Sequence, residues 1–145
     1  MDAPPNTILL VEDDLGQADL IRINLELGNV TQDIVHVTDG QQALDFILRS
    51  GPFEGRPAGS VLVLLDLKLP VLDGIEFLRE VKGRWDSRQT PVLVFAAESN
   101  PRLIAQCYEL GCSLYFPKPL AVEDYISTVE KMAQVIRVAS LPPAV

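Results

Sequence analysis

Cysteine is scarce in this sequence, which has two in 145 residues. Cys107 and Cys112 lie five positions apart, with no Cys-x-x-Cys spacing and no second pair. This count and spacing exclude a disulfide framework. We expect two buried, reduced thiols, as is usual for proteins of a reducing cytoplasm.

Basic residues are also few, with 12 Lys and Arg against 20 Asp and Glu, which gives a net charge of −8. Nucleic-acid phosphates and anionic lipids would repel this chain overall, so we expect neither nucleic acid nor a membrane as a partner. The longest apolar runs are about five residues, against about 20 for a membrane span. Residues 1–6 are polar and broken by proline, unlike a secretion signal, and we therefore expect a cytoplasmic protein.

Apolar residues make up 48% of the chain, too many for a disordered polymer. They are concentrated in short runs that predict five strands: Ile8–Val11, Ile34–Val37, Val61–Leu65, Val92–Phe95 and Leu114–Phe116. The first, third and fourth runs are continuously apolar, as expected for strands that helices cover on both faces. We expect these three strands at the centre of a parallel sheet.

Apolar residues at helical spacing lie between and after these runs. They predict helices around Ala18–Leu25, Ala43–Ile47, Ile75–Val81, Leu103–Leu110 and Val122–Ile136, the first one ending in a left-handed cap at Gly28. Strand and helix thus alternate five times, which predicts an α/β fold with a doubly wound, flavodoxin-like, five-stranded parallel sheet in a single domain. We expect this domain to span residues 7–138, with a disordered N-terminal tail (1–6), a C-terminal tail (139–145) and a long loop at 50–59.

Charged residues follow several of the predicted strands. Glu12, Asp13 and Asp14 follow the first, Asp66 the third, Glu98 the fourth and Lys118 the fifth. Because ligands of open parallel sheets collect at the carboxyl ends of the strands, we expect Glu12, Asp13, Asp66 and Lys118 to converge. Carboxylates 4 Å apart repel each other by about 4 kcal/mol at an effective dielectric of about 20. A divalent cation such as Mg²⁺, which prefers oxygen ligands, would relieve this repulsion.

Each of these charged groups also has an ordinary structural explanation. Acidic residues at 12–14 can complement the dipole of a helix that starts there. Asp66 can cap the loop that leads to the Asp73-Gly74 turn, and Lys118 can be a solvated loop residue. Their joint occurrence at the same edge of the sheet favours a site.

From Thr7 to Lys131 the sequence resembles the receiver domain of two-component response regulators. Ile8–Asp13 resembles the acidic pair after the first strand, Leu65–Gly74 the phosphoacceptor loop, and Lys118-Pro119 the lysine with its following, commonly cis, proline. The resemblance implies that a histidine kinase phosphorylates Asp66 and that Lys118 pairs with the phosphoryl oxygens. It implies direct Mg²⁺ ligation by Asp13 and Asp66, with Glu12 acting through a water and Lys68 through its backbone carbonyl. Such a domain is not an enzyme but supplies groups for its own phosphotransfer and dephosphorylation.

The sequence departs from the family at Ala96, where receivers normally have Thr or Ser. In the family that hydroxyl turns toward the phosphoryl group, and an aromatic residue on the fifth strand, here Tyr115, moves into the vacated space. We expect phosphorylation to persist and the conformational response to weaken, because Ala96 cannot form the hydrogen bond. The alternative is a degenerate receiver that acts as a phosphorylation-independent binding module, with Tyr115 serving only in core packing.

After the last predicted helix only seven residues remain, Ala139–Val145, so we expect signalling through protein association. The chain resembles the single-domain regulators that partner bacterial phytochrome kinases in three features: the loop at 50–59, the sequence of residues 65–70 and the long last helix. Val135, Val138 and Leu141 extend an apolar edge along that helix. Either the tail folds back on this edge, or a homodimer forms through the fourth helix, fifth strand and fifth helix.

Other functions fit less well. A flavodoxin-like flavin site needs a loop that accepts phosphate after the first strand, where this chain is acidic. Phosphatases with an aspartate nucleophile and Toprim-like nucleases need an Asp-x-Asp pair, whereas Lys68 stands two residues after Asp66. We expect His36 to be a strand-end residue away from the acidic cluster and Trp85 to anchor the end of the third helix.

Overall fold

The computed structural model describes residues 5, 7–84 and 90–139. Apart from Pro5 and Ala139, the predicted tails lie outside the described residues, and so does Trp85. The strands are β1 (Thr7–Val11), β2 (Asp33–Val37), β3 (Val61–Leu65), β4 (Val92–Ala96) and β5 (Leu114–Pro117). The helices are α1 (Leu15–Leu27), α2 (Gly40–Leu48), α3 (Gly74–Arg84), α4 (Pro101–Glu109) and α5 (Val122–Val138), with a short 3₁₀ helix, η1 (Gly51–Phe53).

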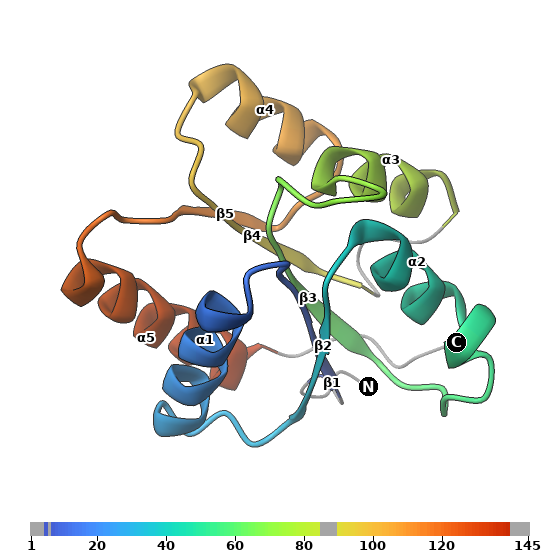
Figure 1. Ribbon diagram of the computed structural model, residues 1–145, viewed down its shortest axis with the longest axis horizontal. Coiled ribbons are helices and arrows are strands. Elements are labelled where there is room, and N and C mark those ends of the chain that lie inside the picture. Colours follow the sequence, from blue (N-terminus) through green and yellow to red (C-terminus); the bar gives the residue numbers. More distant parts are fainter. Residues whose placement is uncertain (1–4, 6, 85–89, 140–145) are drawn as a thin grey trace.

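The five strands form one parallel sheet in the order β2-β1-β3-β4-β5 (Figure 1). The three strands predicted at the centre occupy it, and β3 and β4 are buried along their whole length. The edge strands β2 and β5 are partly exposed. The predicted flavodoxin-like α/β fold is confirmed.

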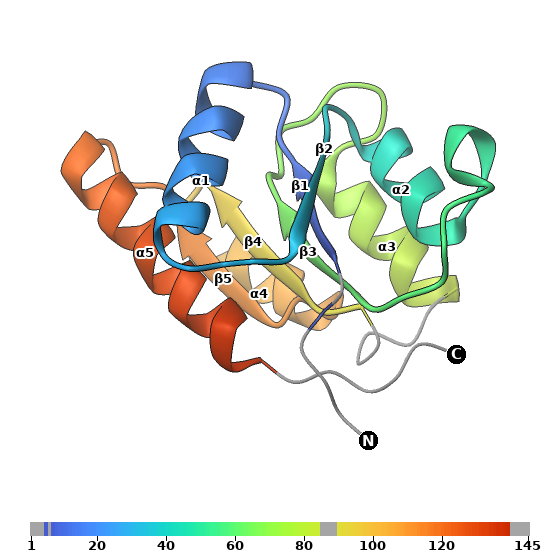
Figure 2. The same cartoon turned by 90° about the horizontal axis from the view of Figure 1, so that it is seen from below.

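Helices cover both faces of the sheet (Figure 2). Helices α1 and α5 pack on one face, against residues such as Ile8, Leu10 and Leu64, whereas α2, α3 and α4 pack on the other, against Leu9 and Val63. Successive side chains of a strand point to opposite faces, so a strand that is covered on both sides must be apolar at every position. This geometry accounts for the continuous apolar runs.

The register of the strands places the charged residues that follow them. Val11 pairs with Leu65, so Glu12 and Asp66 leave the sheet side by side, and the Asp66 amide donates to the Val11 carbonyl at 3.1 Å. On the β4–β5 side of β3, the Lys118 amide donates to the carbonyl of Ala96 at 2.7 Å. The carboxyl ends of β1, β3 and β5 therefore share one edge of the sheet.

Two local predictions need correction. Gly28 is not left-handed: its φ is −81°, and Asn29, at φ 67°, takes the left-handed position. The glycine serves close packing instead, because a Cβ atom there would lie 2.7 Å from the Cβ of Ala133 on α5. The loop predicted at 50–59 contains η1, and Arg56 within it donates to the Phe46 carbonyl at the end of α2, at 2.6 Å.

Other predictions on side chains have mixed outcomes. Cys107 and Cys112 are free and buried, as expected. The apolar edge on α5 is smaller than predicted, because Val135 packs partly against the core while Val138 is 82% exposed. Leu141 lies outside the described residues. Within the described ranges, none of the helices has the length and apolar character that crossing a bilayer requires.

Candidate functional site

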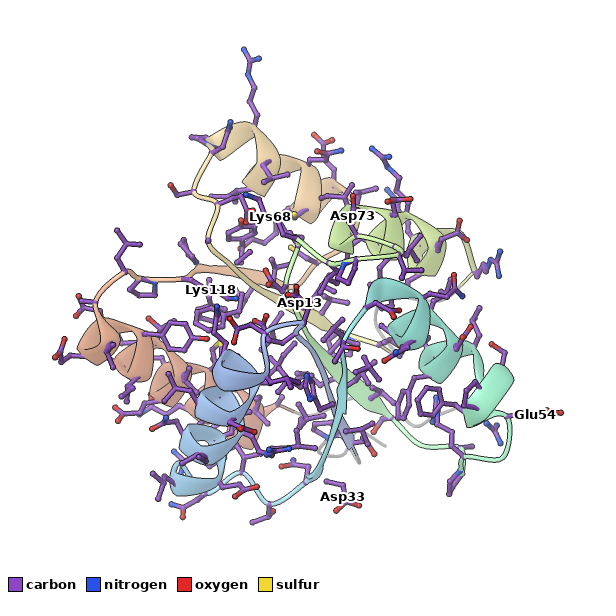
Figure 3. The ribbon with its side chains drawn as sticks, in the orientation of Figure 1. Asp13, Asp33, Glu54, Lys68, Asp73 and Lys118 are labelled. Carbon is purple, nitrogen blue, oxygen red and sulfur yellow. The ribbon has the colours of Figure 1, made fainter. Side chains whose placement is uncertain are left out.

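Three carboxylates meet at the carboxyl ends of β1 and β3. Each of Glu12, Asp13 and Asp66 offers an oxygen that lies within 4.8 Å of the oxygens of the other two. Glu12 is buried, the Asp66 side chain is 11% exposed, and Asp13 is open to solvent. The convergence expected for these acids is present, and Figure 3 shows Asp13 and Lys118 near the middle of the view while Asp33 and Glu54 lie at its periphery.

Lys118 is the positive group of this cluster. Its ammonium donates to Glu12 Oε1 at 2.7 Å, to Asp66 Oδ2 at 3.3 Å and to Gln17 Oε1 at 2.7 Å. The Lys118 side chain is only 9% exposed, so these three acceptors fix a charge that is otherwise flexible. A buried ion pair of this kind holds its position because a lost partner would leave an uncompensated charge.

Sequence reasoning missed Gln17. This residue lies in the first turn of α1, whose start is set by the Asp14 carboxylate accepting from the Gln17 amide at 3.0 Å. The Gln17 side-chain oxygen also accepts from the Tyr125 hydroxyl of α5, at 3.3 Å. Glutamine is an ordinary helix former, and no spacing signal marks it as a partner of Lys118.

Glu12 is the most constrained of the three acids. Its Oε2 accepts from the Asp14 amide at 3.1 Å, and its backbone carbonyl lies 2.7 Å from His36 Nε2. We predicted that His36 lies away from the acidic cluster. This prediction is wrong, because the His36 ring contacts the backbone of Glu12. Burial raises the pKa of Glu12 to about 7, and the ion pair with Lys118 offsets this only in part.

The segment after β3 orients Asp66. Its Oδ1 accepts from the Leu67 amide at 2.8 Å, which leaves Oδ2 toward Lys118. Gly74, the first residue of α3, packs closely against the backbone of Asp66. A Cβ atom at this position would lie 2.6 Å from the carbonyl oxygen of Asp66. Between them Val71 has a φ of 67°, inside a tight turn in which the Leu72 amide donates to the Pro70 carbonyl at 2.7 Å.

Lys68 and Glu98 form a contact that sequence reasoning also missed. The Lys68 ammonium lies 3.5 Å from Glu98 Oε1, and the two side chains are 83% and 19% exposed. Glu98 follows β4, so this ion pair joins the segments after β3 and β4. The expected role of the Lys68 backbone carbonyl stays a prediction.

Ala96 and Tyr115 lie at the ends of the neighbouring strands. Ala96 is fully buried among the core residues that face α2, α3 and α4. The Tyr115 hydroxyl donates to the Glu98 carbonyl at 2.7 Å, and burial raises the pKa of this phenol to about 12. Tyr115 thus combines core packing with a specific hydrogen bond. The described ranges contain no cis peptide, so the Lys118-Pro119 bond is trans, unlike the cis form common in the family.

The donor set fits a hard divalent cation. Three carboxylates and one ammonium leave a net charge of −2, and every candidate ligand atom is an oxygen. Hard cations such as Mg²⁺ prefer this chemistry, and a dication would balance the excess charge. Asp66, oriented beside an ammonium and nearly covered, is also suited to act as a nucleophile toward an anionic group.

Comparison with known proteins gives consistent results. Residues 8–130 match the family model of the response regulator receiver domain. The chain is 33% identical over 127 residues to response regulator Rcp1 of Synechocystis sp., covering 88% of this chain and 86% of Rcp1. The Mn²⁺-bound crystal structure of Rcp1 superposes with a TM-score of 0.86 at 31% identity, covering 95% and 99% of the two chains. The phosphorylated cyanobacterial phytochrome response regulator RcpA gives 0.84 at 30% identity, covering 94% and 98%.

Proposed function

Since the chain belongs to the family of response regulator receiver domains, which are signalling domains and not classical enzymes, we propose that a histidine kinase phosphorylates it on Asp66. The observation that carries this proposal is the position of the Asp66 carboxylate. It lies 3.3 Å from the Lys118 ammonium and within 4.8 Å of two further carboxylates. A nucleophile, a cation and a set of metal ligands are thus assembled by one chain.

The chemistry is an in-line transfer from a phosphohistidine. A carboxylate oxygen of Asp66 attacks phosphorus, an oxygen–phosphorus bond forms, and the nitrogen–phosphorus bond to the histidine breaks. The ammonium of Lys118, held by Glu12 and Gln17, stabilises the charge on the phosphoryl oxygens. Asp13 and Asp66 would hold Mg²⁺ directly, Glu12 would hold it through a water and Lys68 through its backbone carbonyl; the ion would supply positive charge that neutralises the same oxygens.

The partners follow from the relatives and from the exposed surface. RcpA is a phytochrome response regulator, which supports a bacteriophytochrome as the kinase for this cytoplasmic regulator. Its signal then passes by protein association, including a homodimer through α4, β5 and α5. Tyr108 and Leu114 support this face, since both are large apolar residues at least 40% exposed.

A second candidate is a binding module that works without phosphorylation. Ala96 favours it, because no hydroxyl at the end of β4 is available to bind a phosphoryl oxygen. In this case Asp66 and its neighbours would hold the surface in one fixed conformation.

Intact mass after incubation with acetyl phosphate and Mg²⁺ separates the two candidates. The parent should gain one phosphoryl group and Asp66→Asn none. Asp73→Asn is the matched control, because Asp73 lies in the same loop and an asparagine can still cap α3 there. If neither the parent nor Asp73→Asn gains mass, phosphorylation is refuted and the binding module is favoured.

A further inference from the structure

Glu98 connects three segments at the carboxyl edge of the sheet. Its carboxylate pairs with Lys68 in the segment after β3, at 3.5 Å. Its backbone carbonyl accepts from the Tyr115 hydroxyl of β5 at 2.7 Å, and the Tyr115 amide in turn donates to the Tyr108 hydroxyl of α4 at 3.0 Å. A displacement of Glu98 would therefore disturb hydrogen bonds in both β5 and α4.

The carboxylate of Glu98 is poorly satisfied. Its side chain is 19% exposed, and the Oε2 atom is buried with no hydrogen-bond partner among the described residues. In the part of the chain that the structure describes, the ammonium of Lys68 is the cation that pairs with it. Because a partly buried carboxylate is costly without a compensating charge, Glu98 stays in place only while Lys68 remains beside it.

Lys68 is free to exchange partners. It follows Asp66 by two residues, and its side chain is 83% exposed on a flexible four-carbon stem. A phosphoryl group on Asp66 carries about two negative charges, against one on Glu98. The ammonium would be attracted toward Asp66, and the same added charge would repel the carboxylate of Glu98.

On the premise of the proposed function, we propose that Lys68 exchanges the carboxylate of Glu98 for the phosphoryl group on Asp66. Glu98, now unpaired and repelled, moves toward water together with its backbone, so that its carbonyl no longer accepts from the Tyr115 hydroxyl. The exchange of one ion pair thus replaces the hydrogen bond that Ala96 cannot make. The surface that changes is the start of α4 with the adjoining part of β5.

A double-mutant cycle on the affinity for beryllofluoride, measured with Mg²⁺, tests this exchange. Coupling is reciprocal, so breaking the resting ion pair must change the affinity for the phosphoryl mimic. Lys68→Gln should weaken binding about threefold and Glu98→Gln should strengthen it about threefold, as expected for a partly exposed ion pair. In the Lys68→Gln background, Glu98→Gln should strengthen binding less than it does in the parent, because only the repulsion between Glu98 and the mimic is then relieved. Lys82→Gln, which removes an equal charge from the far end of α3, should leave the affinity unchanged.

The outcomes separate this inference from the function on which it rests. If the parent neither binds beryllofluoride nor gains a phosphoryl group, both fail. If the parent binds but Lys68→Gln binds equally well, or Glu98→Gln has the same effect with and without Lys68, only the exchange of partners is refuted. Amide hydrogen exchange gives an independent measure: beryllofluoride should alter residues 97–101 in the parent and leave them unaltered in Lys68→Gln.

Discussion

Val71 should be replaceable by asparagine with a gain in stability. Its φ of 67° lies in the left-handed region, which is unusual for any residue with a side chain and strained for a β-branched one. The left-handed conformation costs an L-residue about 1–2 kcal/mol, and asparagine tolerates it better than most residues. The strain arises in the turn that follows Asp66, where the Leu72 amide donates to the Pro70 carbonyl.

The loss on substitution is small, because Val71 is 81% exposed. Complete burial of a valine contributes about 1.5 kcal/mol, so the covered fifth of this side chain contributes roughly 0.3 kcal/mol. Val71→Asn should therefore stabilise the protein by about 1 kcal/mol and raise its Tm by about 3 °C for a chain of this size. Val71→Gly should gain less, because glycine increases the entropy of the unfolded chain.

Urea unfolding followed by circular dichroism, without divalent cations, measures this difference as a shift in midpoint at constant slope. Val138→Asn is the matched control, since Val138 is 82% exposed at the end of α5. Valine and asparagine have similar helix propensities, so the exchange is nearly neutral there. Its midpoint should not move. A midpoint for Val71→Asn at or below that of the parent would refute the assignment of strain to this turn.

Three further predictions concern the metal site, the helix packing and the thiols. Mg²⁺ at ten times its dissociation constant should raise the free energy of unfolding by about 1.4 kcal/mol in a urea titration. Asp13→Ala should abolish most of this gain, whereas the control Asp33→Ala should keep it. An equal gain in the two variants would contradict the metal site. Gly28→Ala should lower stability by about 1–3 kcal/mol, because its Cβ would meet Ala133. Gly55→Ala is the control and should not lower it, because a Cβ atom there has no neighbouring contact within 4 Å. Equal melting temperatures of the two variants would exclude the close packing. Burial raises the pKa of Cys107 and raises that of Cys112 to about 12. The thiolate fraction, and with it the rate of alkylation, should therefore stay low from pH 8 to pH 10 in the folded protein and rise in urea. Rapid labelling at pH 8 without urea would contradict this.

The fold and the centre of the site could be predicted because their signals are local in the chain. Continuous apolar runs identified β1, β3 and β4 as central strands, and the carboxyl ends of parallel strands meet at one edge. Glu12, Asp66 and Lys118 each follow such a strand directly, so their convergence follows from topology alone. The resemblance to receivers added the roles of these residues, which no spacing rule supplies.

The sequence by itself determined which elements form and which charged residues share an edge, since periodicity and strand order are properties of short segments. Only the tertiary structure decided that Gln17 holds Lys118, that Lys68 pairs with Glu98, and that Gly28 packs against α5 instead of taking a left-handed turn. Each of these contacts joins segments far apart in the chain. It depends on the distance between packed helices or on the direction of a loop, and these are fixed only when the whole core has closed.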